Sequence, residues 1–186
     1  MEDEMAELEV QLVTCAQSNN NDFPGLVNDI AEFVTDAGYE IVEQNADKPW
    51  GAYLRLNSAQ ADRFIDEFFP GLSPQEARLG IDDAELSPKF LLVKPSERLS
   101  WQYHHRRAER WRFLTDGAYR RSETNEENDR LEVSAGEVVQ FQKGERHRLE
   151  GMPDAVVLVA EIWQHVDAAD PSNEDDIVRV SDDYVR

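Results

Sequence analysis

The sequence predicts a mainly β protein in which α-helices precede an antiparallel sandwich or barrel. From residue 89 onward, short apolar segments alternate with turns that contain Gly117, Gly136, Gly144 and Gly151. Many short strands with turn signals between them are typical of sandwiches and barrels, and not of alternating β-α units. Before residue 89, apolar residues recur at helical spacing instead. The 186 residues suffice for one domain with a substantial core.

Three segments before residue 89 carry helix signals at their ends. An apolar stripe over residues 26–37 is followed by Gly38 at the position of a C-terminal cap. Ser58 is expected to cap a second helix. The run Ser-Pro-Gln-Glu at 73–76 has a capping-box pattern with proline in the first turn. These signals predict three helices, the last two within residues 57–88.

The predicted strands occupy the second half of the chain, and both ends of the chain are acidic. Residues 1–22 form an acidic arm, for which a short docking helix is one alternative because Leu8 and Leu12 lie near helical spacing. The acidic tail 167–186 is expected to wrap the barrel through Ile177 and Val178. The candidate strands are 89–94, 99–105, 110–115, 117–122, 131–133, 137–142, 147–150 and 155–166.

These boundaries divide the chain into two parts. Residues 1–45 are expected to form an N-terminal arm and helix, and residues 46–186 a barrel domain with a helical insertion at 57–88. The single cysteine, Cys15, excludes a disulfide framework and fits a reducing compartment. The acidic first residues are not followed by an apolar segment of signal-peptide type. A cytoplasmic location is therefore expected.

The charge of the chain restricts its partners. There are 39 Asp and Glu against 19 Lys and Arg, which gives a formal net charge of -20. Nucleic acids and anionic membranes would be repelled, so neither is expected as a partner. A carboxylate-rich surface with few lysines indicates a halophile with a salt-rich cytoplasm, and an ordinary acidic protein is the alternative.

A candidate metal site lies in the middle of the predicted strands. Residues two apart on a strand face the same way, so Gln102 and His104 project together. Glu109 follows on the next strand, and His147 offers a second imidazole in a later strand. An amide oxygen, two imidazoles and a carboxylate suit Zn, Mn, Fe, Co or Ni, and no thiolate narrows the choice. The alternative is a set of surface or hydrogen-bonded histidines.

Four ordered blocks of the sequence resemble a known family. They are Lys-Pro-Trp-Gly-x-Tyr at 48–53, Pro-Ser-Glu-Arg-Leu-Ser at 95–100, Gln-x-His-x4-Glu at 102–109 with the later His147, and Glu-Asp-Asp-Ile-Val-Arg at 174–179. Together they resemble the cupin barrel of type II mannose-6-phosphate isomerases. In that family a His-x-His-x4-Glu motif precedes a distant His, and Gln in the first place is a feature of phosphomannose isomerases. A short bacterial branch that is also labelled phosphoheptose isomerase is similar over the same blocks.

The resemblance implies a fold, an activity and a cofactor. The fold is a cupin barrel, that is, a double-stranded β-helix or jelly roll, with added N-terminal helices. The activity is a metal-dependent aldose–ketose isomerisation of a sugar phosphate in carbohydrate metabolism, with mannose 6-phosphate to fructose 6-phosphate as the first expectation. The cofactor is one divalent ion held by Gln102, His104, Glu109 and His147. Zinc is expected first, with Mn, Fe, Co or Ni as alternatives.

An isomerase also needs a base that carries a proton between C1 and C2. Glu161 is the first candidate, because it alternates onto one face of an apolar strand where burial would raise its pKa. The alternative is that Glu161 orients a ligand or pairs with an arginine. His105 is a second candidate for the base, although alternation points it away from His104. His165 is expected to be structural.

The substrate phosphate requires cations in this acidic chain. Lys89 is the first candidate, because it matches a lysine of the family and begins a predicted strand, and it is also a candidate catalytic residue. Arg179 in the fourth block is the next, and Arg148 and Arg106 are further candidates. Trp50 is expected to line the mouth of the barrel. These cations and the metal would have to reverse the negative field inside the barrel.

Two other functions stay open at this stage. One is a non-catalytic cupin that binds a sugar, and the other is a metal-dependent cupin oxygenase, because a fold does not fix a function. Barrels of the resembled class often pair, so a homodimer is expected by analogy.

Overall fold

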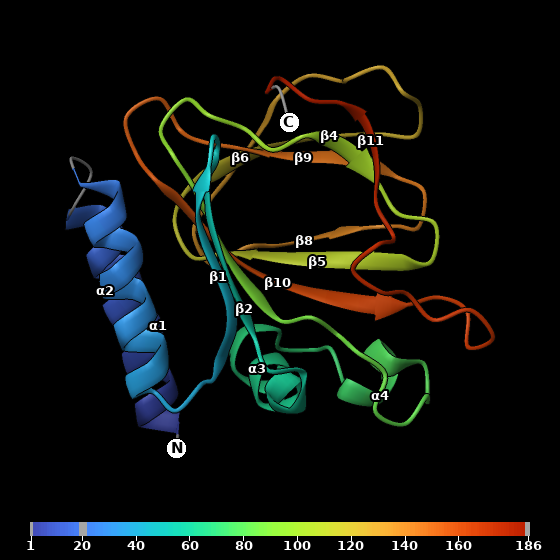
Figure 1. The fold of residues 1–186 in the computed structure, drawn as a ribbon, viewed down its shortest axis with the longest axis horizontal. Coiled ribbons are helices and arrows are strands. Elements are labelled where there is room, and N and C mark those ends of the chain that lie inside the picture. The colour runs from blue at the N-terminus through green and yellow to red at the C-terminus, as the bar shows by residue number, and fades with distance from the viewer. Residues whose placement is uncertain (1, 19–21, 185–186) are drawn as a thin grey trace.

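Two antiparallel sheets face each other in the computed structural model, which describes residues 2–18 and 22–184 (Figure 1). The larger sheet has the strand order β1-β2-β3-β10-β5-β8, and the smaller one the order β11-β4-β9-β6-β7. The strands are β1 (Ile41–Lys48), β2 (Gly51–Leu56), β3 (Lys89–Val93), β4 (Trp101–Tyr103), β5 (Arg107–Phe113), β6 (Gly117–Ser122), β7 (Leu131–Val133), β8 (Val138–Phe141), β9 (Arg146–Glu150), β10 (Val157–His165) and β11 (Val178–Ser181). The prediction of a mainly β protein with an antiparallel sandwich or barrel is confirmed.

The two faces of the larger sheet belong to two different cores. On β10, Val157 and Val159 point between the sheets, whereas Leu158 and Ala160 point to the outer face. β3 alternates in the same way, and each of its five residues is buried. Because both faces of these strands are buried, their sequences are continuous apolar runs and do not alternate between apolar and polar residues.

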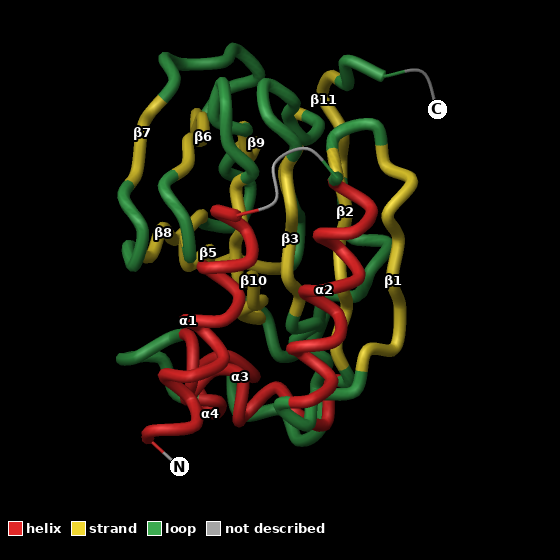
Figure 2. The backbone as a smooth tube through the Cα atoms, turned by 90° about the vertical axis from the view of Figure 1, so that its left-hand side faces the viewer, coloured by secondary structure: helices red, strands yellow, loops and turns green. Residues whose placement is uncertain are grey.

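Helices cover the outer face of the larger sheet (Figure 2). They are α1 (Glu2–Ser18), α2 (Phe23–Asp36), the 3-10 turn η1 (Ser58–Gln60), α3 (Ala61–Phe68) and α4 (Pro74–Arg78). Phe64 and Phe68 of α3 meet Phe90 of β3 edge-on, with ring centroids 5.3 Å apart in both pairs. The docking helix considered for the N-terminal arm is present, and it buries Leu8 and Leu12. Residues 19–21, near the end of the expected arm, lie outside the described residues.

The helix caps agree with the sequence signals except at one position. Gly38 follows α2 with φ +86, and Ser73 and Glu76 form the capping box of α4. Ser58, however, caps no helix: Asn57 caps the 3-10 turn η1 by accepting a hydrogen bond from the N–H of Ala59, and Gln60 at the N-cap of α3 makes no side-chain cap hydrogen bond. Ser58 instead accepts from the N–H of Leu86 at 3.3 Å. Both residue types are good caps, so the pattern alone did not separate them.

The hairpin of β1 and β2 is the main element that the sequence did not predict. Half of the residues of β1 are exposed and none is buried, as expected of a polar strand at a sheet edge, so β1 lacks the alternation that marks a half-buried strand. Gly51 is required at its turn, because a Cβ there would lie 1.9 Å from the carbonyl oxygen of Leu92. The expected domain boundary after residue 45 falls inside β1.

The acidic tail returns to the barrel, as predicted. β11 pairs with β4 at the edge of the smaller sheet, where Arg179 lies opposite Gln102. The segment before β11 packs against the turn after β4, through contacts of Asp176 described below. None of the helices in the described part of the chain is long and apolar enough to cross a membrane.

Candidate metal centre and cavity

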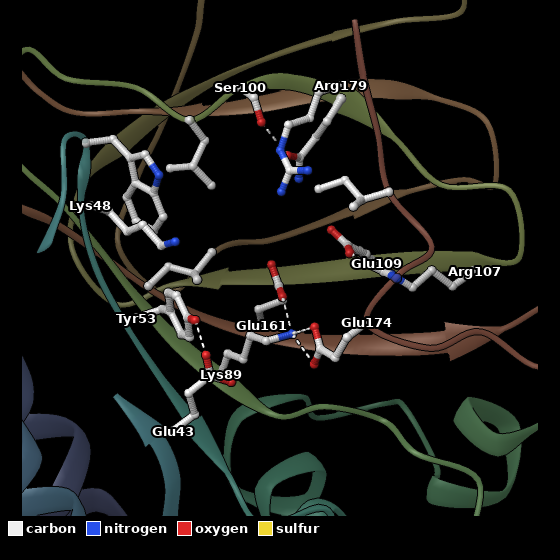
Figure 3. A pocket seen from close by; sticks show the side chains of 15 residues that line it. Glu43, Lys48, Tyr53, Lys89, Ser100, Arg107, Glu109, Glu161, Glu174 and Arg179 are labelled. Atoms are coloured by element: carbon white, nitrogen blue, oxygen red, sulfur yellow. Dashed lines mark hydrogen bonds and ion pairs between the residues drawn. The ribbon is translucent and has the colours of Figure 1, made fainter. Parts of the chain in front are cut away.

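A cavity of about 320 Å³ lies between the two sheets (Figure 3). Side chains from both sheets and from the tail line it. They are Glu43, Lys48, Trp50, Tyr53, Lys89, Leu91, Leu99, Ser100, Gln102, Arg107, Glu109, Glu161, Glu174, Ile177 and Arg179. The predicted residues Gln102, Glu109, Glu161, Lys89, Arg179 and Trp50 are therefore brought together.

Two buried histidines lie against Glu109 of the cavity wall, and neither histidine is itself a lining residue of the cavity. Glu109 lies on β5 of the larger sheet, and His147 lies on β9 of the smaller one. His104 follows β4. One ligand atom from each residue lies within 4.8 Å of the others, and all three side chains are buried. The His–His–Glu cluster could thus hold a metal ion.

The hydrogen bonds of the two imidazoles fix which nitrogen faces the cluster. Nδ1 of His104 lies 2.5 Å from the carbonyl oxygen of Asp176, and Nδ1 of His147 lies 3.0 Å from that of Glu145. A carbonyl can only accept, so each Nδ1 carries the proton. In a neutral ring with the proton on Nδ1, Nε2 has a free lone pair. Metal-binding histidines are commonly held in this way, with Nδ1–H donating to a backbone carbonyl and Nε2 facing the metal.

Without a cation, the facing atoms of this cluster would all be acceptors. Nε2 of His104 is 3.0 Å from Oε1 of Glu109, and Nε2 of His147 is 3.2 Å from Oε2. Nε2 of His104 is buried and forms no hydrogen bond of acceptable geometry. Protonation of His104 is disfavoured, because burial lowers its pKa. The donor set and this orphaned nitrogen fit a divalent ion, whose identity the N/O ligands leave open.

Arg107 is a site residue that the sequence analysis missed. Its Nε donates to Oε1 of Glu109 at 2.9 Å, and its guanidinium stacks over the ring of Trp163. Burial acts to raise the pKa of Glu109, but the charge of His104, in its protonated form, and that of Arg107 hold that pKa well below its usual value. Strand alternation was the available signal, because Arg107 lies two residues before Glu109 on the same face of β5.

Gln102 lies next to the cluster on the smaller sheet. It is the cross-strand partner of His147, so the two side chains leave the sheet on the same side. Its Oε1 accepts a hydrogen bond from Ser100 at 2.7 Å. The hydrogen bond from Ser100 identifies this atom as the amide oxygen and fixes its position. The oxygen could therefore serve as a fourth, uncharged metal ligand.

Glu161 lies in the cavity wall contributed by β10 (Figure 3). Its Oε2 accepts from Nε1 of Trp111 at 2.9 Å, and its Oε1 lies 3.7 Å from Nζ of Lys89. Burial, together with the charge of Glu109, raises the pKa of Glu161 to about 7, against the opposing effect of Lys89. A carboxyl with such a pKa can accept and return a proton near neutrality.

Lys89 already has anionic partners in the cavity. Glu174, from the tail, lies 3.0 Å and 3.2 Å from its Nζ through the two carboxylate oxygens. Ser87 also donates to Glu174. The ammonium lies 4.5 Å from the ring centroid of Trp163. A phosphate at Lys89 would therefore have to compete with the carboxylate of Glu174.

The other predicted residues lie outside the cavity. Arg148 points to the opposite face of β9 from His147, where it donates to Glu127 at 2.7 Å. Arg106 is held by the tail, through the carbonyl of Pro171 at 3.0 Å. His105 is exposed. His165 bonds the carbonyl of Glu85 at 2.8 Å, as a structural histidine would. The structure does not bring Arg148, Arg106 or His105 to the candidate site.

The electrostatic balance of the cavity differs from that of the whole chain. Its charged lining residues are the acids Glu43, Glu109, Glu161 and Glu174 and the bases Lys48, Lys89, Arg107 and Arg179. Four carboxylates thus face four cations, in a chain of net charge -20. A divalent ion at the cluster would make the cavity net positive, which is the local reversal that an anionic ligand requires.

Comparison with known proteins agrees with this architecture. The family model described as "Mannose-6-phosphate isomerase C-terminal" matches residues 80–182, which is more than half of the chain. The match includes all four proposed ligand positions. No curated protein matches the sequence.

Several solved structures are similar to this chain at low sequence identity. CapF in complex with the inhibitor 3-isopropenyl-tropolone is similar with a TM-score of 0.51 and 15% identity, over 95% of this chain and 45% of the CapF chain. CapF from Staphylococcus aureus, a capsular polysaccharide assembling protein, gives 0.49 and 18%, over 86% and 38%. A predicted oxalate decarboxylase from Thermotoga maritima gives 0.45 and 14%, over 70% and 96%. This chain spans less than half of the CapF chains, and at these identities the similarity concerns the fold alone.

The cluster predicts a sharp difference between two adjacent histidines. We expect His104→Ala to lower the affinity for zinc by at least about 100-fold, because it removes a ligand. Replacing a residue that only orients a ligand already lowers metal affinity by about 10- to 100-fold. His105→Ala is the matched control, because its ring is exposed and outside the cluster. Metal content after dialysis and competition with a chelator measure both. Equal zinc affinity in the two variants would contradict the assignment.

Proposed function

The chain belongs to the mannose-6-phosphate isomerase C-terminal family, and from that premise we propose that it is a metal-dependent aldose–ketose isomerase of a sugar phosphate. Mannose 6-phosphate is the first substrate to be tested. The observation that carries the proposal is a buried His–His–Glu cluster whose Glu109 lines the cavity, together with a second carboxyl of the same lining, Glu161, whose pKa is raised to about 7. The first supplies a place for a cation, and the second a proton carrier.

The metal would be held by His104, His147 and Glu109, with Gln102 as the fourth ligand. When bound, a divalent ion would supply Lewis-acid polarisation of the carbonyl and hydroxyl oxygens at C1 and C2. Arg107 keeps the carboxylate of Glu109 ionised and oriented toward the imidazoles. Because Glu109 is the single anion among the four ligands, the filled site would stay net positive and favour developing oxyanion charge.

Glu161 is proposed as the base. In the aldose-to-ketose direction its carboxylate would take the proton from C2 and return it to C1, while the hydroxyl proton moves from O2 to O1, so that substrate and product are isomers. Trp111 and Lys89 hold the two oxygens of Glu161 in place. Lys89 is thus proposed to act mainly on Glu161, which modifies its predicted role as the first phosphate contact.

The phosphate is proposed to lie at the side of the cavity lined by Arg179. Arg179 projects into the cavity from β11 (Figure 3). Lys48 also lines the cavity, beside Trp50. The Lys89 region is less suited to an anion, since Glu174 and Glu161 already face that ammonium.

The direct test is turnover of sugar phosphates in deuterated water by the zinc- or manganese-loaded protein. We expect fructose 6-phosphate from mannose 6-phosphate, with deuterium entering at C1 or C2 because the proton passes through a carboxyl that exchanges with solvent. NMR of the products measures both. If a panel that includes heptose phosphates shows neither product nor exchange, the isomerase proposal fails and a sugar-binding role becomes the better account.

Glu161→Gln removes the proposed base while keeping the size of the side chain. We expect kcat to fall by about 10²- to 10⁴-fold with unchanged metal content, because a positioned general base contributes that much. Glu137→Gln, at an exposed position outside the cavity, is the matched control. Steady-state kinetics and metal analysis measure the two effects. Retention of full activity by the Glu161→Gln variant would overturn this role.

The raised pKa of Glu161 also predicts the pH dependence. Only the ionised carboxylate accepts a proton, and its fraction increases as the pH rises through the pKa of about 7. We therefore expect kcat/KM to increase about tenfold per pH unit below pH 7 and to level off above it. The profile is measured with saturating metal at each pH. A rate that is flat between pH 5.5 and 7 would contradict Glu161 as the base.

A further inference from the structure

We propose that Asp176, on the tail, is a positioning residue for the metal centre: it anchors a peptide carbonyl that orients one proposed ligand directly and a second through Arg107. This inference rests on the metal site of the proposed function, and not on the identity of the sugar. Asp176 lies 72 residues from His104 in the sequence, and it is 5% exposed.

The carboxylate of Asp176 fastens the tail to the turn between β4 and β5. Its Oδ1 accepts from the backbone N–H of His105 at 2.8 Å, and its Oδ2 accepts from that of Arg106 at 2.9 Å. The hydroxyl of Ser172 donates to Oδ2 at 2.8 Å. Three donors on one buried carboxylate make a rigid anchor, because a charged acceptor strengthens each of these hydrogen bonds.

The carbonyl of the same residue faces the metal centre. Its oxygen accepts from Nδ1 of His104 at 2.5 Å and from Nη1 of Arg107 at 3.0 Å. The first contact fixes the tautomer and the ring orientation of His104. The second fixes the guanidinium that donates to Glu109. The carbonyl of Asp176 therefore contacts both the ring of His104 and the guanidinium that holds Glu109, and Nη1 of Arg107 also donates to Ser172 and to the carbonyl of Asn173 on the same tail.

The anchor also couples the metal centre to the cavity wall. Glu174, Ile177 and Arg179, which lie within three residues of Asp176, line the cavity. If the anchor is lost, the carbonyl and this wall should shift together. The Nδ1 of His147 is held by a different carbonyl, that of Glu145, which does not belong to the tail.

The test compares Asp176→Ala with Asp175→Ala, an exposed neighbour on the same segment. We expect Asp176→Ala to weaken zinc binding by about 10- to 100-fold, the range for loss of a contact that orients a ligand, and Asp175→Ala to leave it within about threefold of the wild type. Asp176→Asn, which keeps one acceptor oxygen, should fall between them. Competition with a chelator measures all three affinities.

A second readout separates positioning from a general loss of stability. In NMR spectra of the zinc-loaded protein, the Nδ1–H of His104 should exchange with solvent at least tenfold faster in Asp176→Ala, while that of His147 stays protected. Only four histidines need assignment. Equal acceleration at both rings would indicate a merely structural role and overturn the proposal, as would wild-type zinc affinity in Asp176→Ala.

The outcomes also distinguish this inference from the function it rests on. A wild-type protein that binds no divalent ion would contradict the metal-dependent mechanism itself. A wild type that binds zinc tightly, together with an Asp176→Ala variant that binds it equally well, would contradict only the role of Asp176.

Discussion

The site depends on one electrostatic constraint: three buried acceptor groups meet between two sheets. Glu109 comes from the larger sheet, and His104 and His147 come from the smaller one. Backbone carbonyls hold the ring protons on Nδ1, so neutral imidazoles present only lone pairs to the carboxylate. A divalent ion at this cluster would satisfy all three groups and would link the two sheets. The cavity lies beside this cluster, and Asp176 of the tail contacts one of its histidines.

The sequence predicted the parts of the site that have local or alternating spacing. Gln102 and His104 lie two residues apart, and the mainly β class and the strands after residue 89 follow from short apolar segments and turns, whereas the cupin barrel was expected from the family resemblance. Arg107 obeyed the same alternation but was overlooked beside the acidic and histidine ligands. The role of Asp176 could not be predicted, because a contact between the tail and a turn about 70 residues earlier has no periodic signature.

Lys89 shows why residue type alone does not settle a binding role. The sequence correctly placed it at the start of a barrel strand, and it lines the cavity. Its partners, Glu174 and Glu161, come from the tail and from β10, and only the folded chain reveals them. The same holds for Arg148, whose strand position next to His147 turns it outward. The homodimer and the salt-rich cytoplasm stay predictions.

X-ray absorption at the metal edge of the purified, metal-loaded protein tests the central claim most directly. The account predicts one ion per chain with nitrogen and oxygen ligands at about 2.0–2.2 Å, including two imidazoles, since zinc binds histidine and carboxylate at those distances. In the His147→Ala variant, the absorption spectrum should show one imidazole ligand fewer than in the wild type. An ion surrounded by oxygen alone, as expected for binding at the acidic surface, would contradict the account.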